Sequence, residues 1–167
     1  MVEVAMSLVD IKAGFLCRAA AMCLLLAGMT GGLSACAVLG WGPSVKLGAV
    51  TLDMTRRAND DTPLAVDFVA VKEPELLKVL QSLPAAKWFE QREQLQRDYP
   101  EGMKIWSLEL VPGQHVETEE VPIHGERAQG LLVFAGYASP GMHRLNLGEI
   151  RKAWIRLEEK DLRLIQP

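Results

Sequence analysis

Two hydrophobic periods divide the chain beyond residue 44. Residues 45–55 and 64–71 carry an apolar side chain at every second position, which is typical of strands with a buried face. Over residues 73–98 the apolar positions recur at three- and four-residue spacing, and Pro84 separates two predicted helices. Strand character then returns in six further segments, which are 103–111, 115–123, 130–137, 143–147, 153–157 and 162–165.

This order of elements predicts a mainly β fold. We expect a single domain over residues 45–167, built as a β-sandwich of about seven short strands with a helical pair inserted at about 73–98. An α+β arrangement, with the helices on one face of a single sheet, is the alternative. The segment 56–63 between the first two strands is polar and rich in turn-forming residues, so it is predicted to be an exposed loop.

The N-terminal residues have the pattern of a bacterial export signal. Lys12 and Arg18 precede an apolar run over residues 19–29, which is too short to cross about 30 Å of hydrocarbon. An uncleaved membrane helix is the alternative, but the glycines at the end of the run disfavour it.

The sequence Leu33-Ser34-Ala35-Cys36 that follows resembles the lipoprotein box. This resemblance implies a signal peptide over residues 1–35, acylation of the Cys36 thiol with diacylglycerol and palmitate-type chains, and a lipidated tether over residues 36–44. Several acyl chains would hold the protein permanently on a membrane. Ala37 resembles the signal that sends such lipoproteins to the outer membrane.

Composition excludes several classes of function. The chain has three cysteines and a formal net charge of −3. Cys17 and Cys23 would leave with the signal peptide and Cys36 would carry lipid, so the domain is predicted to be held by packing without a disulfide. The net charge offers no electrostatic basis for binding nucleic acid.

No catalytic or metal-binding pattern is evident. His115, His124 and His143 are scattered and lack the spacing of a zinc site, so they are interpreted as surface residues. Residues 136–141 lack the serine elbow of hydrolases, and no glycine-rich phosphate loop is found. We therefore expect no enzyme activity, no metal and no cofactor.

Four aromatic residues lie in or near the helical pair: Trp88, Phe89, Tyr99 and Trp106. They are predicted to be structural, with the first two seating a helix on the sheet and Trp106 filling the core. An aromatic hot spot for a protein partner is the alternative.

Several motifs, in order, resemble one family. The box at Cys36 is followed by a strand at 50–55, a second at 66–71, an aromatic pair at 88–89 and a strand that ends in Pro112-Gly113. Strand 131–137 then leads to a loop and to His143-Arg144. This pattern resembles the outer-membrane lipoprotein family of type VI secretion, TssJ.

The resemblance implies a transthyretin-like sandwich with a helical addition and a non-enzymatic role on the periplasmic face of the outer membrane. Its partner would be the periplasmic domain of an inner-membrane secretion protein, TssM-like, bound through the loop after the first strand. In this chain the predicted contacts in that loop are Arg56, Arg57, Asn59, Asp60 and Asp61.

Two other functions remain open from the sequence. A pilot lipoprotein that escorts a secretin would use the helical pair as a groove or ligand. A cell-wall-binding or hydrolytic lipoprotein in the periplasm would need a concave site with convergent polar groups.

Overall fold

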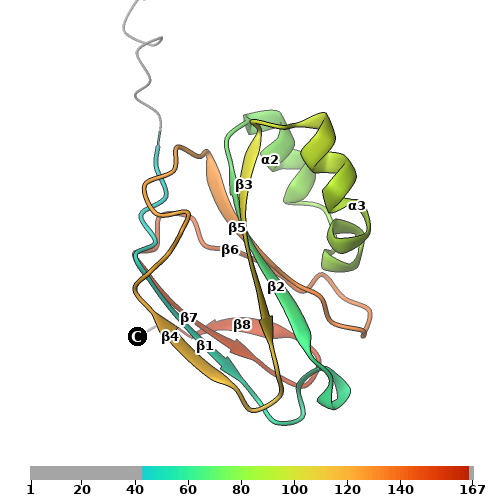
Figure 1. The fold of residues 1–167 in the computed structure, drawn as a ribbon. Helices are drawn as coiled ribbons and strands as arrows, with labels where there is room; N and C mark the ends of the chain where they lie inside the picture. Colours follow the sequence, from blue (N-terminus) through green and yellow to red (C-terminus); the bar gives the residue numbers. More distant parts are fainter. Residues whose placement is uncertain (1–42, 166–167) are drawn as a thin grey trace, which may run out of the picture. The chain divides into compact units, whose positions relative to one another are not determined.

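A computed structural model describes residues 43–165, which form a two-layered β-sandwich with a pair of helices on one side (Figure 1). The predicted signal peptide, Cys36 and nearly all of the tether lie outside the described residues. The helices are α2 (Pro74–Leu80) and α3 (Ala85–Asp98), with a short 3₁₀ segment η2 (Ala58–Asp61). The strands are β1 (Ala49–Met54), β2 (Leu64–Val71), β3 (Met103–Leu110), β4 (His115–Thr118), β5 (Gly130–Ala135), β6 (Arg144–Asn146), β7 (Lys152–Leu157) and β8 (Leu162–Ile165).

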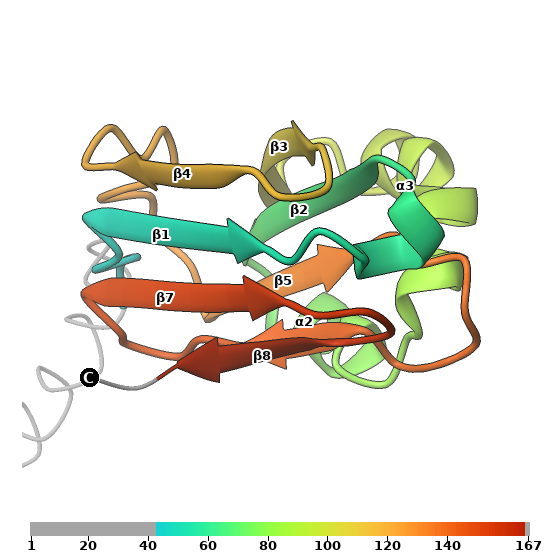
Figure 2. The same ribbon diagram turned by 90° about the horizontal axis from the view of Figure 1, so that it is seen from below.

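The strands form two four-stranded sheets, ordered β4-β1-β7-β8 and β3-β2-β5-β6. Figure 2 looks onto the sheet β4-β1-β7-β8, with the second sheet and the helices behind it. All strand pairs are antiparallel except β1 and β7, which run in the same direction with Ala49 opposite Lys152 and Met54 opposite Leu157. The predicted β-sandwich with an inserted helical pair is confirmed.

Several predicted strands are shorter in the structure. The first begins at Ala49 instead of residue 45, although Val45 and Leu47 are buried in the core. The polar strand near His115 ends at Thr118, where the Thr118 Oγ1 accepts a 3.0 Å hydrogen bond from the backbone N–H of Glu120 and turns the chain. Both segments keep apolar residues facing inward, so the alternating pattern extends beyond the hydrogen-bonded ladder.

The burial patterns of β1 and β2 explain why only one sheet is covered by helices. In β1 buried and partly exposed residues alternate, whereas β2 is buried at seven of its eight positions. A strand buried on both faces needs a layer on each side. The second layer over β2 and β5 is the helical pair, while the outer face of the sheet containing β1 is left open (Figure 1).

Helix α3 is held on the sheet by one buried aromatic residue and one buried charge. The Trp88 ring is fully buried and stacks on Phe134 of β5, with centroids 4.9 Å apart. Asp67 of β2 is also fully buried, and its Oδ2 accepts hydrogen bonds from Trp88 Nε1 at 2.9 Å and from Arg92 at 3.1 Å. The predicted role of Trp88 in seating the helix therefore agrees with its position.

A second arginine closes the end of α2. The Arg144 guanidinium of β6 donates hydrogen bonds to the carbonyl oxygens of Leu80 at 2.9 Å and Leu83 at 3.4 Å. The Leu80 carbonyl also accepts a 3.2 Å hydrogen bond from the backbone N–H of Leu83, so Arg144 adds to the hydrogen bonding at a helix end, where carbonyls lack the regular helical partner. Burial lowers the pKa of Arg144.

The main core lies between the sheets and includes Phe68. Trp106 of β3 is partly buried and packs on Phe68 with ring centroids 4.9 Å apart, at the edge of this core rather than at its centre. Neither helix in residues 43–165 has the length and hydropathy that crossing a membrane requires.

Candidate functional site

The loop between β1 and β2 lies at the end of the sandwich opposite the point where the described chain begins (Figure 1). Strand β1 runs from one end to the other, and its six residues span about 20 Å. Residues 43–48 therefore lie at one end of the domain, and residues 55–63 lie at the other.

Asn59 anchors this loop from inside. It is 6% exposed, and its side-chain Nδ2 donates hydrogen bonds to Thr62 Oγ1 at 2.8 Å and to the Pro63 carbonyl at 3.1 Å. Its Oδ1 accepts a 2.8 Å hydrogen bond from the backbone N–H of Ala138. Its own N–H donates to the carbonyl of Glu159 at 3.0 Å. One residue thus ties the loop to two other segments.

The backbone of the loop is strained at three consecutive positions. Asn59, Asp60 and Asp61 have φ values of 50°, 54° and 59°, all in the left-handed region. This region costs an L-residue roughly 1–2 kcal/mol, although asparagine and aspartate tolerate it best. The left-handed turn projects Asp60 and Asp61 outward, and both are exposed.

Tyr137 holds the neighbouring turn between β7 and β8. Its hydroxyl lies 3.0 Å from the Glu158 carbonyl oxygen and 2.8 Å from that of Asp161, and it donates its single proton to this pair of acceptors. Burial raises the pKa of Tyr137 well above its usual range, and the nearby charges of Asp161 and Glu158 raise it further.

His143 completes the frame around this turn. Its ring is buried at 4% exposure and packs on Tyr137 with centroids 4.8 Å apart. Its Nδ1 lies 3.0 Å from Asp161 Oδ1, and its Nε2 lies 2.9 Å from the Ser139 carbonyl oxygen. His143 is thus a buried structural residue, so its interpretation as a surface histidine was wrong.

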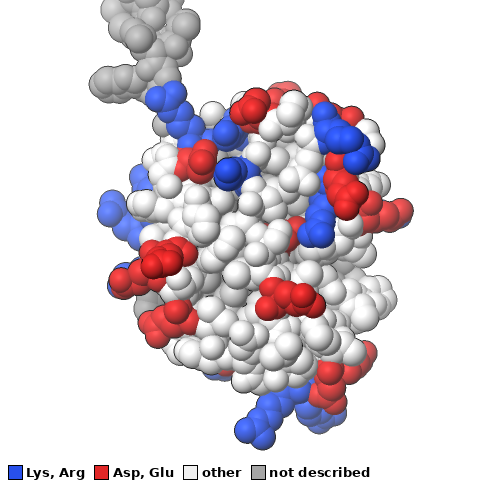
Figure 3. All heavy atoms as spheres, in the orientation of Figure 1, with Lys and Arg blue, Asp and Glu red and all other residues white. Residues whose placement is uncertain are grey.

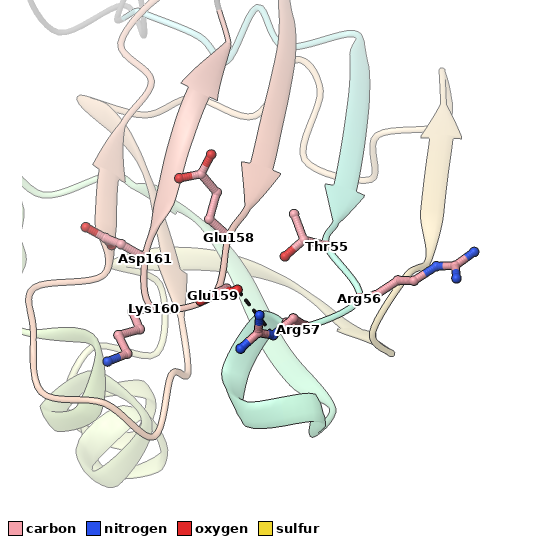
Figure 4. A pocket seen from close by; sticks show the side chains of 7 residues that line it. All are labelled: Thr55, Arg56, Arg57, Glu158, Glu159, Lys160 and Asp161. Carbon is pink, nitrogen blue, oxygen red and sulfur yellow. Dashed lines mark ion pairs between the residues drawn. The ribbon is translucent and has the colours of Figure 1, made fainter.

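The loop and the turn together enclose a shallow depression of about 650 Å³ (Figure 4). Arg57 and Glu159 form an ion pair across it, with Nε and Oε1 3.4 Å apart. The hydroxyl of Thr55 in its wall is buried and has no hydrogen-bond partner among the described residues. Its lining is Thr55, Arg56, Arg57, Glu158, Glu159, Lys160 and Asp161.

Charges of both signs are concentrated at this end. Three cations and three anions line the depression, and the exposed Asp60 and Asp61 lie on the adjacent loop. In Figure 3 the lower end of the domain, where η2 lies in Figure 1, carries blue and red side chains close together. Exposed charged side chains on a hydrogen-bonded frame can orient a charged protein surface. No group of three potential metal ligands occurs within residues 43–165.

The structure divides the five residues predicted to contact a partner. The side chains of four of them, Arg56, Arg57, Asp60 and Asp61, are exposed. Asn59 is buried, and its side chain is used in hydrogen bonds within the domain. The expectation that segment 56–63 is exposed throughout was therefore wrong at Asn59 and at its buried neighbour Ala58.

Sequence reasoning did not include the turn Glu158–Asp161 in the site. The proximity of these residues to the first loop depends on the pairing of β1 with β7, which the local pattern does not show.

Comparison with known proteins was informative only at the level of structure. No protein-family model matches the sequence, and no curated protein matches it significantly. Solved structures do match this chain in fold, and type VI secretion lipoproteins are among them.

The particular fold is that of TssJ. TssJ1, a type VI secretion lipoprotein from Pseudomonas aeruginosa, matches with a TM-score of 0.51 and 16% identity over 71% of this chain and 95% of its own. Serratia marcescens Lip, a membrane-bound component of the type VI secretion system, matches with a TM-score of 0.52 and 14% identity over 71% and 96%. A chain of a type VI membrane complex matches with a TM-score of 0.56 and 16% identity over 74% and 100%. At these identities the likeness establishes the fold.

Proposed function

We propose that this chain is a TssJ-like lipoprotein that ties a secretion-system membrane complex to the outer membrane. Cys36 carries the lipid on the periplasmic face, and the opposite end of the domain binds the periplasmic domain of a TssM-like inner-membrane protein. The role is non-enzymatic, with the depression between the first loop and the β7–β8 turn as the contact surface.

The observation that carries this proposal is the placement of the two ends. The described chain starts at Pro43, seven residues after Cys36, at one end of the sandwich. The charged loop and turn lie at the other end, about 20 Å away along β1. A lipid anchor before Pro43 leaves the charged end free for a partner. The likeness to nearly the whole length of type VI lipoproteins supports the same assignment.

The anchor is tested by mass spectrometry of the protein from a bacterial membrane fraction. We expect a mature N-terminus at Cys36 with acyl chains attached, and we expect Cys36→Ser to release the protein from the membrane. A mature N-terminus elsewhere, without acyl groups, would refute the anchor.

The binding surface is tested separately, with the periplasmic domain of the TssM-like protein from the same genome as the probe. Replacing Asp60 and Asp61 with alanine, or Arg56 and Arg57 with alanine, should raise the Kd by about tenfold or more, because these charges orient the partner. All four side chains are exposed, so the fold should persist.

The matched control removes an exposed charged pair elsewhere. Glu75 and Lys78 on α2 form an ion pair 2.8 Å long with side chains 83% and 70% exposed. Replacing both with alanine should leave the Kd unchanged. Equal loss of binding in the control, or no loss in the loop variants, would count against the proposed surface.

The two alternatives from the sequence are less well supported. A secretin pilot would offer its helical pair as an apolar groove, but Leu76, Leu80 and Trp88 are buried against the sheet. A wall-degrading enzyme would need an enclosed site, whereas the depression at the charged end is shallow and lined by six charged side chains.

A further inference from the structure

The open outer face of the sheet β4-β1-β7-β8 carries a small groove that the proposed site does not use. Its volume is about 170 Å³. Ala49 and Thr51 of the central strand β1 form its floor, because both are small and point away from the core. Long side chains on the two flanking strands rise on either side, so the groove follows β1.

The two walls differ in chemistry. Glu117 lies opposite Thr51 on one side, and Trp154 lies opposite Thr51 on the other. Glu119 extends the first wall past the end of β4. Trp154 is 41% exposed, the only large aromatic side chain among the described residues with so much open surface.

The next row of paired residues on this face of the sheet, which contains Asp53 and Arg156, joins a carboxylate to a guanidinium. Two residues further along, Asp53 accepts hydrogen bonds from Arg156 at 3.1 and 3.2 Å. The chain thus supplies its own guanidinium to the carboxylate of that row. Within residues 43–165, neither Glu117 nor Glu119 takes part in an ion pair. Glu117 lies in the row of Thr51 and Trp154, which has no cation, whereas Glu119 lies beside the row of Ala49 and Lys152.

We propose that this groove is a second docking site, which receives an arginine side chain of a partner protein between Trp154 and the carboxylates of Glu117 and Glu119. The site lies on a different face from the proposed TssM-binding end and does not depend on that assignment.

The geometry suits a guanidinium. Strands β4 and β7 are separated by β1, so their backbones lie about 10 Å apart. A planar cation can stack on the tryptophan within about 6 Å of the ring centroid while it donates two parallel hydrogen bonds to a carboxylate. Lysine fits less well because its ammonium lacks the flat face and the fork of donors.

Lys152 at the rim sets the orientation of the occupant. It lies opposite Ala49 on β7, next to the Glu119 end of the groove. With two glutamates and one lysine, the lining keeps a net negative charge. An incoming cation is therefore favoured nearer Glu117 and Trp154, away from the ammonium of Lys152.

The test is a titration of the full-length protein in detergent, with ¹⁵N-labelled tryptophan, followed by NMR of the indole N–H signals. The probe is acetyl-Gly-Arg-Gly-amide, and the matched peptide carries citrulline, which has the same shape without the charge. Trp154→Phe assigns the signal. We expect a saturable shift of the Trp154 signal, with a Kd on the order of millimolar for so small a ligand, and a much smaller shift with citrulline.

Two double variants separate the carboxylates from general charge. Glu117→Gln with Glu119→Gln should raise the Kd by about fivefold, since exposed charge pairs contribute up to about 1 kcal/mol. Glu75→Gln with Glu90→Gln, on the helix surfaces, should leave it unchanged. Equal shifts with both peptides, or unchanged binding in the groove variant, would overturn the proposal. So would a Trp154 shift caused by an N-acetylglucosamine tetramer and not by the arginine peptide, which would indicate a glycan site.

Discussion

Replacing Asn59 with alanine should destabilise the domain far more than replacing its exposed neighbours. The Asn59 side chain makes three hydrogen bonds, to Thr62, Pro63 and Ala138, at 2.8, 3.1 and 2.8 Å. At about 1 kcal/mol each, their loss costs about 3 kcal/mol. Alanine at a φ of 50° adds roughly 1 kcal/mol, so the expected total is about 4 kcal/mol.

Two further variants separate these contributions. Asn59→Gly removes the hydrogen bonds but accepts the left-handed backbone, so it should cost about 3 kcal/mol and be more stable than Asn59→Ala. Asp60→Ala keeps the hydrogen bonds of Asn59. It should lower the free energy of unfolding by only about 1 kcal/mol, because alanine tolerates the φ of 54° less well than aspartate does.

The assay is urea and thermal unfolding followed by circular dichroism. For a domain of this size 1 kcal/mol corresponds to about 3–6 °C in Tm, so Asn59→Ala should melt roughly 12–24 °C below the wild type. The reasoning fails if Asn59→Ala lies within 1 kcal/mol of the wild type. It also fails if Asn59→Gly is the less stable of the two, because the backbone argument requires the opposite order.

Three other outcomes are expected. Asp67→Ala should lower the free energy of unfolding in urea by about 2–4 kcal/mol, and the exposure of Arg92, 37%, favours the lower end of that range. Asp67→Asn should cost less, because its amide oxygen can still accept a hydrogen bond from Trp88. Because the pKa of Tyr137 is raised, folding favours its neutral form. Its contribution to the free energy of unfolding is therefore complete below about pH 10 and is lost as the pH rises further. The stability of Tyr137→Phe should lack this part of the decline at alkaline pH. Gly102→Ala should cost about 1–3 kcal/mol in thermal unfolding, because the new Cβ would lie 2.9 Å from the Cβ of Tyr99, and a cost near zero would show that the turn can shift.

The sheet containing β2 illustrates how far local pattern reaches. The near-continuous apolar run of β2 and β5 requires cover on both faces, and the helical pattern over residues 73–98 is the segment that supplies it. Only Asp67 interrupts the run. Its partners Trp88 and Arg92 are 21 and 25 residues away, so the pattern marks the position as unusual without showing how the charge is satisfied.

The candidate site shows the limit of the same reasoning. The exposed charges at Arg56, Arg57, Asp60 and Asp61 follow from the polar, turn-rich composition of their segment. Asn59 has the same local signals as its neighbours, yet it is buried. Its burial depends on the backbone of Ala138, which is 79 residues away.

By itself, the sequence determined the approximate positions of the strands, the two helices, the exposed charges of the first loop and the faces that turn inward, because side-chain periodicity reports burial over a few residues. Only the tertiary structure decided that β1 pairs in parallel with β7, that the turn Glu158–Asp161 joins the first loop, and that Glu117 and Trp154 flank one groove. These contacts join residues far apart in the chain. They depend on which strands become neighbours, a choice made by the packing of all the apolar faces together.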